Sequence, residues 1–523
     1  MPSFLADVLD DKVARNGLIA GSVALLAAAL DPKVWSPALP TVQAAIREHA
    51  QLEAVTLLLA VSGSALLLLG GAVGDSARAR RIIVGGLVVE LLAGVVGLVL
   101  TSGPFFVASR FMGHAGAAFV IPVSIALVAT SYRGVARATA IGLAYGAYGA
   151  AGAAGPILLE VIPGARWPAF LAAIVASGLA LWVVRNRVRD LPRPATPERP
   201  YVVGTAIWAF GIIAITVGVM WFGSGPFDPL RWTLILGGAA VLGVALIHDR
   251  RRSRRSAEPI RIERRPVAVA IFIGVVMAIS QTAPMLELPL YFHLVLGYGP
   301  LLAMVAVGPL FAALVLAGPV AGILLGRFSP RWLVGFGAIV VGLGNLLLAV
   351  FTTPSAGYIA FVLPCLLVGA GFVVATTVRT AIIFASVPRG LPATAAALNE
   401  ASISVGARIG IVIVTGVVAQ VAIAAYTASV AGMSAVDAEA AIGAFRDVLV
   451  AIGTPSFTEI ATAVGPTDMQ PYLEAYTTGM RAALVAGGVV AVVGGVVALL
   501  ALGRQDPLAT VWEHRDERVI AGG

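Results

Sequence analysis

Residues 71–101 read GAVGDSARARRIIVGGLVVELLAGVVGLVLT, and this stretch places three arginines directly before about twenty apolar residues. About 20 mostly apolar residues are enough for an α-helix to cross the hydrocarbon core of a bilayer. Residues 82–101 meet that length, and Glu90 is the one charged residue among them. The positive-inside rule assigns clustered arginines to cytoplasmic loops. The stretch therefore predicts a membrane-spanning helix that starts at the cytoplasmic side.

The composition extends this pattern to the whole chain. Of its 523 residues, 59% are hydrophobic and 12% are charged, and the mean hydropathy is +0.95. Soluble domains carry about twice that charged fraction, about 25%. We therefore predict an all-α polytopic membrane protein. The fourteen apolar segments long enough to span are 17–39, 54–74, 82–101, 104–130, 138–162, 167–184, 202–222, 231–247, 267–292, 301–325, 331–351, 357–386, 400–425 and 479–502.

The positive charges test this count independently. With a cytoplasmic N-terminus, 26 of the 35 lysines and arginines fall in cytoplasmic tails and loops. That asymmetry follows the positive-inside rule and predicts an inner-membrane protein with both termini in the cytoplasm. The basic segment 248–266 then fixes topology and meets lipid headgroups, and we expect no nucleic acid partner. A cleaved signal peptide is the alternative for the first segment, because Lys12 and Arg15 precede an apolar run.

The sequence offers little support for an enzyme. Only two lysines occur, Lys12 and Lys33, and neither follows a glycine, so there is no Walker A loop for ATP. HExxH, CxxC and GxSxG motifs are also absent from the sequence, and the single Cys365 cannot form an intramolecular disulfide. We expect no cofactor and no metal site.

Short motifs at the span edges point to one family. Leu30-Asp31 through Leu39-Pro40 resembles the first-span signature LDxTIVNVALP, and residues 110–116, RFMGHAG, resemble a fourth-span RxxQGxG. Further resemblances are residues 71–81 and 322–331 to two copies of a cytoplasmic loop motif, residues 149–156 to GxxxGPxxGG, residues 290–298 to LYLQxVLGYS, and residues 399–410 to NxxRxLGGALG. Seven motifs in this order resemble the drug:proton antiporters of the major facilitator superfamily, in the fourteen-span QacA/EmrB-like branch.

The resemblance implies a domain organisation. It predicts a cytoplasmic N-terminus over 1–16, six-helix halves over 17–184 and 267–502, and a cytoplasmic tail over 503–523. Segment 185–266 would add two central spans, about 202–222 and 231–247. The only sizeable extramembrane part, 426–478, is predicted to be external and to form short helices over the outer mouth, with a gating role or none. The motifs also depart from the family, with Ser76, Gly113, His114 and Gly326 at altered positions.

The function implied by the resemblance is secondary active export of small hydrophobic, often cationic, compounds by proton antiport. Two halves that rock around a midplane site give alternating access. One alternative is an exporter of a specific endogenous metabolite or lipid-like molecule. Another is a membrane scaffold that presents segment 426–478 to a partner. The expected partners are a small-molecule substrate, protons and the lipid bilayer, and we expect a monomer.

Charged residues inside the spans are the natural candidates for the site, because burying them in lipid is costly. Asp31 matches the first-span acid and shares a helix face with Trp35 one turn on, while Pro32 loosens the helix between them. Glu400, Ser404 and Arg408 form one polar stripe at helical spacing. Since Lys33, Arg110, Arg379 and Arg408 balance four intramembrane acids, structural ion pairs are the alternative.

The candidates fall into three groups. The proton-coupling candidates are Asp31, Glu287, Glu90, Arg110 and His114. The substrate-cavity candidates are Trp35, Tyr145, Tyr148, Tyr291, His293, Asn399, Glu400 and Arg408. The conformational motifs comprise Gly71, Asp75, Arg78, Arg80, Arg81, Gly152, Gly155, Pro156, Gly322 and Arg327.

Overall fold

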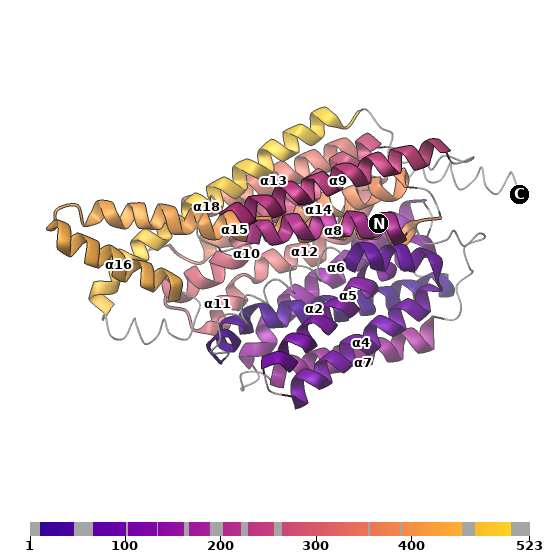
Figure 1. The fold of residues 1–523 in the computed structure, drawn as a ribbon, viewed down its shortest axis with the longest axis horizontal. Helices are drawn as coiled ribbons and strands as arrows, with labels where there is room; N and C mark the ends of the chain where they lie inside the picture. Colours follow the sequence, from indigo (N-terminus) through magenta and orange to yellow (C-terminus); the bar gives the residue numbers. More distant parts are fainter. Residues whose placement is uncertain are drawn as a thin grey trace, which may run out of the picture.

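All regular elements that the structure describes are helices. The computed structural model describes residues 11–45, 66–100, 103–132, 134–161, 167–188, 202–220, 228–255, 264–353, 356–387, 390–451 and 466–503. Its helices run side by side in one elongated bundle (Figure 1). A bilayer offers no water to backbone N–H and C=O groups, and a helix satisfies them within its own segment. The prediction of an all-α protein is confirmed.

The amino-terminal half contains six helices in the described part of the chain. Helix α2 packs against α5, α6 and α7, and α4 packs against α5 and α7. A shorter apolar helix, Leu66–Ser76, lies beside α5 and α15, because Gly70 contacts Ala118 and Gly71 contacts Ala397. The bounds of the others are α2 Lys12–Ala45, α4 Ala79–Val99, α5 Gly103–Ser131, α6 Gly134–Val161 and α7 Trp167–Arg187.

Two helices connect the halves in sequence. Helices α8 (Val202–Met220) and α9 (Pro229–Arg255) pack closely against each other, and α8 also touches α15. They lie in front of the carboxyl-terminal half in Figure 1. At the α8 contact, Trp208 and Ile212 cover a small apolar cluster of Leu68, Ala397 and Ala401. The pair therefore lies at the side of the bundle, where it meets the edge between the two halves.

The carboxyl-terminal half is built from the helices that follow. Helix α13 packs against α14 and α18, and α10 packs against α14, α15 and α18. The helix bounds are α10 Arg264–Leu294, α11 Pro300–Ala306, α12 Gly308–Leu325, α13 Pro330–Phe351, α14 Ile359–Ser386, α15 Pro392–Ser429, α16 Ala435–Ala451 and α18 Pro466–Ala501. The short α11 and α12 follow one another, and Gly308-Pro309 lies where α12 begins.

Ten helices in the described ranges are long and apolar enough to cross a bilayer. Shorter apolar helices cover Leu66–Ser76, Ile207–Val219 and Pro229–Ala245. Large apolar side chains on outward helix faces, such as Leu92, Trp182 and Phe336, are exposed and would meet lipid acyl chains. The chain is therefore a multi-pass membrane protein, and the count of fourteen spans stays a prediction.

The predicted external segment 426–478 is continuous with two helices of the bundle. Helix α15 has 38 residues and runs to Ser429, while α18 begins at Pro466. At 1.5 Å per residue α15 is about 57 Å long, which exceeds a hydrocarbon core of about 30 Å. Helix α16 packs on the ends of both, and the rings of Tyr426, Phe445 and Tyr472 pack together with centroids 4.6–5.2 Å apart.

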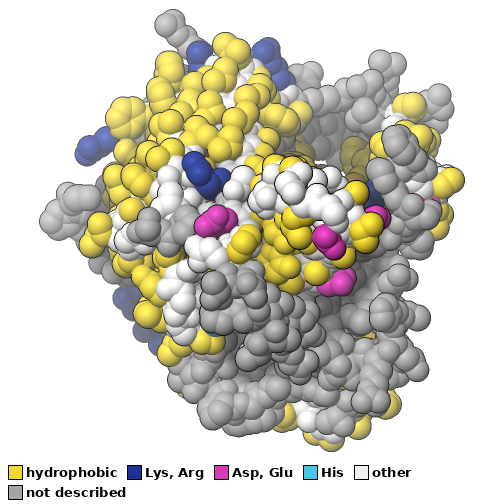
Figure 2. All heavy atoms as spheres, turned by 90° about the vertical axis from the view of Figure 1, so that its left-hand side faces the viewer, with side chains coloured by type: hydrophobic (Ala, Val, Ile, Leu, Met, Phe, Trp, Pro, Cys, Tyr) yellow, Lys and Arg dark blue, Asp and Glu magenta, His cyan; other side chains and the backbone are white. Residues whose placement is uncertain are grey.

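The end of α15 from Ala422, helix α16 and the start of α18 up to Ala475 form an extension that we call the projection (Figure 1). Its small core of Ala422, Tyr426, Val430, Phe445 and Ala475 is separate from the main core of the bundle. Figure 2 looks onto this end and shows acidic side chains at the surface beside apolar ones. The exposed acids of the projection are Asp437, Glu439, Asp447 and Glu474.

Candidate functional site

The two halves meet along a seam of small residues. Gly142 of α6 and Gly318 of α12 lie backbone to backbone, and Gly322 lies against Ala138 and Thr139. Farther along, a Cβ on Gly152 would come within 2.9 Å of the Phe311 ring. Small residues allow membrane helices to approach this closely. Gly152, Gly155 and Gly322, which the sequence marked as conformational residues, are buried, and Gly152 and Gly322 lie on the seam.

A second junction lies at the predicted cytoplasmic end. The Asp75 carboxylate accepts hydrogen bonds from the backbone N–H groups of Ala393, at 2.7 Å, and Thr394, at 2.9 Å. These N–H groups belong to the first turn of α15, where a helix leaves its donors unpaired and favours negative charge. Gly71 and Gly74 allow the close approach, because a Cβ on either would press on Ala393 or Ala397. The loop motif of one half therefore caps a helix of the other.

Between these junctions a ring of polar side chains joins the halves. The Tyr145 hydroxyl of α6 donates a hydrogen bond of 2.8 Å to Glu400 Oε1 of α15. Asn399 Nδ2 lies 2.6 Å from the Tyr145 oxygen and 3.0 Å from Glu400 Oε1. The Thr380 hydroxyl of α14 lies 3.2 Å from the Tyr145 oxygen. All four residues are at least nine-tenths buried. We call this set the polar ring.

Arg379 supports the polar ring from behind. Its guanidinium donates to Ser402 Oγ at 2.9 Å, to the Asn399 carbonyl at 3.2 Å and to the Ala270 carbonyl at 3.4 Å. A side chain on Gly274 would collide with this guanidinium and with Ser402, so the glycine makes the space. Arg379 is fully buried, and the hydrogen bonds that it makes go to neutral oxygens. Such a charge needs a nearby counter-charge or a dense set of acceptors.

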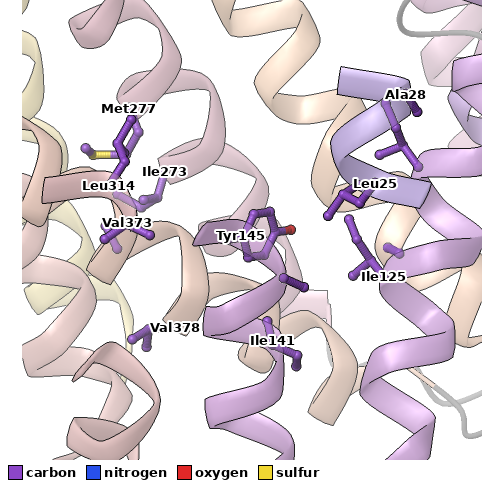
Figure 3. Close-up of a cluster of buried hydrophobic side chains, with 14 of the residues drawn as sticks. Leu25, Ala28, Ile125, Ile141, Tyr145, Ile273, Met277, Leu314, Val373 and Val378 are labelled. Atoms are coloured by element: carbon purple, nitrogen blue, oxygen red, sulfur yellow. The ribbon is translucent and has the colours of Figure 1, made fainter. Parts of the chain in front are cut away.

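The surroundings of the polar ring are apolar. In Figure 3, Tyr145 stands between the side chains of Leu25, Ala28 and Ile125 on one side and those of Ile273, Met277 and Leu314 on the other. These side chains belong to one continuous core that spans both halves. A low-dielectric environment strengthens hydrogen bonds and makes each unpaired polar group costly. The polar ring is therefore an isolated polar site at the centre of the protein.

The candidates of the amino-terminal half form a separate group. Glu90 of α4 is buried and accepts a 3.1 Å hydrogen bond from Ser177 of α7. Arg110 of α5 is also buried, and its guanidinium lies 5.3 Å from the centroid of the Phe170 ring. His114 Nδ1 lies 2.9 Å from the Arg110 carbonyl oxygen, one turn earlier in the same helix. These contacts lie within one half and do not reach the polar ring.

The candidates of α10 lie in the carboxyl-terminal half. Glu287 accepts a 2.6 Å hydrogen bond from the Tyr476 hydroxyl of α18, and both residues are buried. Tyr291 donates to the Thr353 carbonyl at 2.5 Å and packs against Phe361. His293 is exposed, with Nδ1 2.7 Å from the Tyr298 carbonyl oxygen. The structure therefore does not bring Tyr291 and His293 to the polar ring with the other substrate-cavity candidates.

The remaining candidates are not members of the polar ring or have side chains outside the described part of the structure. Tyr148 is half-buried one turn after Tyr145, and Arg408 is half-buried two turns after Glu400. Arg80 donates to the Arg185 carbonyl at 3.1 Å, Arg78 is the residue before α4, and Arg81 and Arg327 are exposed. Asp31 and Trp35 lie on α2 and Pro156 lies on α6, but their side chains are outside the described part of the structure.

Sequence reasoning missed the support of the polar ring. Arg379 was noted as an intramembrane base and given no role, and Thr380 and Tyr476 were not noted. A signal for Arg379 and Thr380 was present, because residues 376–380 read TTVRT inside an otherwise apolar segment. A helix places Thr376 and Thr380 on one face. A polar run of this kind inside a span must face protein, and it could have been added to the candidates beside the stripe of Glu400, Ser404 and Arg408.

The architecture defines a class of protein: a polytopic helical bundle of two halves with a buried polar site between them. The chain belongs to the major facilitator superfamily, whose family model matches residues 21–411. Transporters of this superfamily carry small molecules, and the proteins that this chain resembles are transporters, not enzymes. The chain spans 58% and 59% of the length of two of these relatives.

Its curated relatives include transport, resistance and export proteins of Streptomyces and Amycolatopsis. The chain is 26% identical over 340 residues to a probable actinorhodin transporter of Streptomyces coelicolor, a match that covers 63% of this chain and 58% of that protein. It is 28% identical over 414 residues to a puromycin resistance protein of Streptomyces alboniger, covering 77% and 81%. A cephamycin export protein of Amycolatopsis lactamdurans is 26% identical, covering 68% and 75%.

Solved structures support the fold. The human organic anion transporter MFSD10 superposes with a TM-score of 0.55 and 12% identity, covering 93% of this chain and 99% of that one. A proton:xylose symporter gives a TM-score of 0.54 and 15% identity, covering 95% and 99%. At these identities the likeness concerns the fold alone.

Proposed function

We propose that the protein exports small hydrophobic organic compounds across the cell inner membrane by proton antiport with alternating access. Relatives named for actinorhodin, puromycin and cephamycin support a substrate of the antibiotic kind. The sequence left two substrate classes open, namely small hydrophobic compounds and a specific endogenous metabolite. A secreted natural product belongs to both classes. The fourteen-span topology, with both termini and residues 248–266 cytoplasmic, belongs to the same proposal.

The polar ring carries this proposal. Its hydrogen bonds join α6 of one half to α14 and α15 of the other, inside an apolar core. A rocking motion of the halves must break and remake these bonds, so the site can sense which conformation the protein occupies. A membrane scaffold without transport gains nothing from a buried charged group at such a junction, because burying it is costly.

Proton coupling needs at least one carboxylate that reaches both sides in turn. Asp31, Glu90, Glu287, Arg110 and His114 stay proposed participants, and Asp31 is the one that the family's first-span motif suggests. We expect Asp31→Asn to reduce proton-driven export sharply while the protein stays folded.

Transport by the purified full-length protein tests the proposal. The protein is reconstituted in liposomes, and ethidium serves as a hydrophobic cationic probe and puromycin as a probe named after a relative. An imposed proton gradient should drive uptake of at least one probe, and a protonophore should abolish that uptake. Probe movement that ignores the gradient would contradict antiport. Absence of movement for both probes would contradict the proposed substrate class.

A further inference from the structure

The hydroxyl groups of the polar ring allow Glu400 to exist in two protonation states. A charged carboxylate only accepts hydrogen bonds, whereas a protonated one also donates. In the charged state the Tyr145 O–H donates to Glu400 Oε1, as the 2.8 Å contact permits. Asn399 Nδ2 has two hydrogens, and one of them reaches the same oxygen at 3.0 Å. The charged carboxylate then accepts hydrogen bonds from two donors.

The protonated state is satisfied by reversing one hydroxyl. The Glu400 O–H donates to the Tyr145 oxygen, and the Tyr145 O–H turns toward Thr380 Oγ1, 3.2 Å away. Thr380 can accept because its own hydrogen is used in a 2.7 Å bond to the Thr376 carbonyl one turn earlier. No heavy atom has to move and no donor is lost. Buried groups without such an alternative rarely change protonation, because an unpaired donor or acceptor costs about 1–3 kcal/mol.

The titratable groups around Glu400 determine what its protonation changes. Tyr145 contacts Glu400 from α6, where Tyr148 lies one turn farther on, and Arg379 supports the neighbouring Asn399 from α14. Glu287 of α10 bonds to Tyr476 instead, and Arg110 of α5 lies on Phe170. Protonation of Glu400 therefore removes the negative charge that balances Arg379, inside an apolar core. It also weakens the charge-assisted bond that holds α6 to α15.

We propose that Glu400 is a proton-binding site, that the Tyr145 and Thr380 hydroxyls switch direction when the proton binds, and that Arg379 is a positioning residue for it. The proton enters at Glu400, the Tyr145–Glu400 bond weakens, and the halves become free to separate at the polar ring. Release of the proton restores the charged bond. The coupling role rests on the proposed function, whereas proton binding by Glu400 does not.

The first test measures proton binding without any substrate. Infrared spectra of the purified protein in detergent are recorded as a function of pH, because a protonated carboxyl has its own C=O stretching band. Glu400→Gln should remove one pH-dependent band that the wild type shows. An unchanged set of bands would overturn the proposal. This result does not depend on transport, so it stays informative if no probe is carried.

Two further variants distinguish the switch of the Tyr145 and Thr380 hydroxyls, which we call the relay, from a general loss of stability. Thr380→Val removes the acceptor needed by the protonated state, so proton affinity should weaken about tenfold, equivalent to about 1.4 kcal/mol. Tyr145→Phe removes the donor of the charged state, so proton affinity should rise. The matched controls are Thr352→Val, whose hydroxyl also makes a buried 2.7 Å bond one turn back, and Tyr476→Phe, whose hydroxyl also meets a buried carboxylate. Equal band shifts in variants and controls would contradict the relay.

Transport then tests the coupling role. In liposomes, Glu400→Gln should lose about tenfold or more of gradient-driven ethidium uptake, equivalent to at least about 1.4 kcal/mol. Exchange of ethidium between the two sides should persist, because exchange needs no net proton movement. Loss of both processes in a protein that elutes as a folded monodisperse species would make Glu400 a substrate ligand or a structural residue, and would overturn the coupling role.

Discussion

The protein contains two buried tyrosine–glutamate pairs with the same chemistry and different positions. Tyr145 and Glu400 come from opposite halves, at 2.8 Å. Tyr476 and Glu287 come from α18 and α10, which pack together in one half, at 2.6 Å. Rigid-body rocking leaves the second pair intact and must break the first. The comparison teaches that a hydrogen bond to a buried carboxylate senses the rocking of the halves directly where that bond crosses the moving boundary.

The largest effect is expected at Arg379, which supports the Tyr145–Glu400 pair between the halves. Arg379→Met leaves Glu400 without its nearby positive charge and removes the three hydrogen bonds that Arg379 makes, so the free energy of unfolding should fall by about 3–5 kcal/mol. Thermal unfolding in detergent measures the loss. Arg481→Met is the control, because Arg481 is exposed and donates one 3.1 Å bond to the Ala349 carbonyl. Equal losses in both variants would show that the buried charge has no special role.

Substitution of the two tyrosines should then have similar effects on stability and different effects on transport. Tyr145→Phe and Tyr476→Phe each remove one hydroxyl bond to a charged group, which stabilises by about 1.5–3 kcal/mol. Both variants should lower the unfolding temperature, but Tyr145→Phe should change gradient-driven flux more than Tyr476→Phe, because only the Tyr145 bond joins the two halves. Parallel unfolding and flux measurements on the two proteins check this. A flux defect in Tyr476→Phe as large as that in Tyr145→Phe would break the comparison, and would return Glu287 to the centre of coupling.

The Asp75 cap also crosses the boundary between the halves. Asp75→Asn keeps the shape of the side chain but removes the negative charge at the start of α15, so the closed junction should weaken by about 0.5–2 kcal/mol. Labelling of a cysteine introduced at Thr394 should become faster, because the junction opens more often. The Thr394→Cys protein with native Asp75 gives the reference rate. An unchanged rate would show that the cap has no influence on opening.

The smallest effect is expected at the projection. A short Gly-Ser linker in place of residues 431–465 removes α16 and leaves the described lengths of α15 and α18 in place. Since α16 packs on a core separate from that of the bundle, flux should change by less than about twofold, which is under about 0.5 kcal/mol. Flux and unfolding temperature are measured together. Loss of the folded protein would show that the projection is integral to the carboxyl-terminal half.

The sequence by itself determined the class of the protein and the positions of most helices that the structure describes. Hydropathy and charge are local properties, and a bilayer forces each long apolar segment into a helix. The segments 82–101 and 331–351 therefore match α4, Ala79–Val99, and α13, Pro330–Phe351, closely. The stripe of Glu400, Ser404 and Arg408 was also readable, because helical spacing orients residues within one helix.

Only the tertiary structure decided which polar residues meet. Tyr145 and Glu400 are 255 residues apart, and nothing in either helix states which neighbour it faces. Shape and small residues set that choice: Gly142 against Gly318 draws α6 to the other half, and Gly274 makes the space for Arg379. Periodicity orients a side chain about its own helix axis, whereas the packing of helices determines its partners. The sequence therefore supplied most members of the polar ring, and the fold brought them together with Arg379 and Thr380.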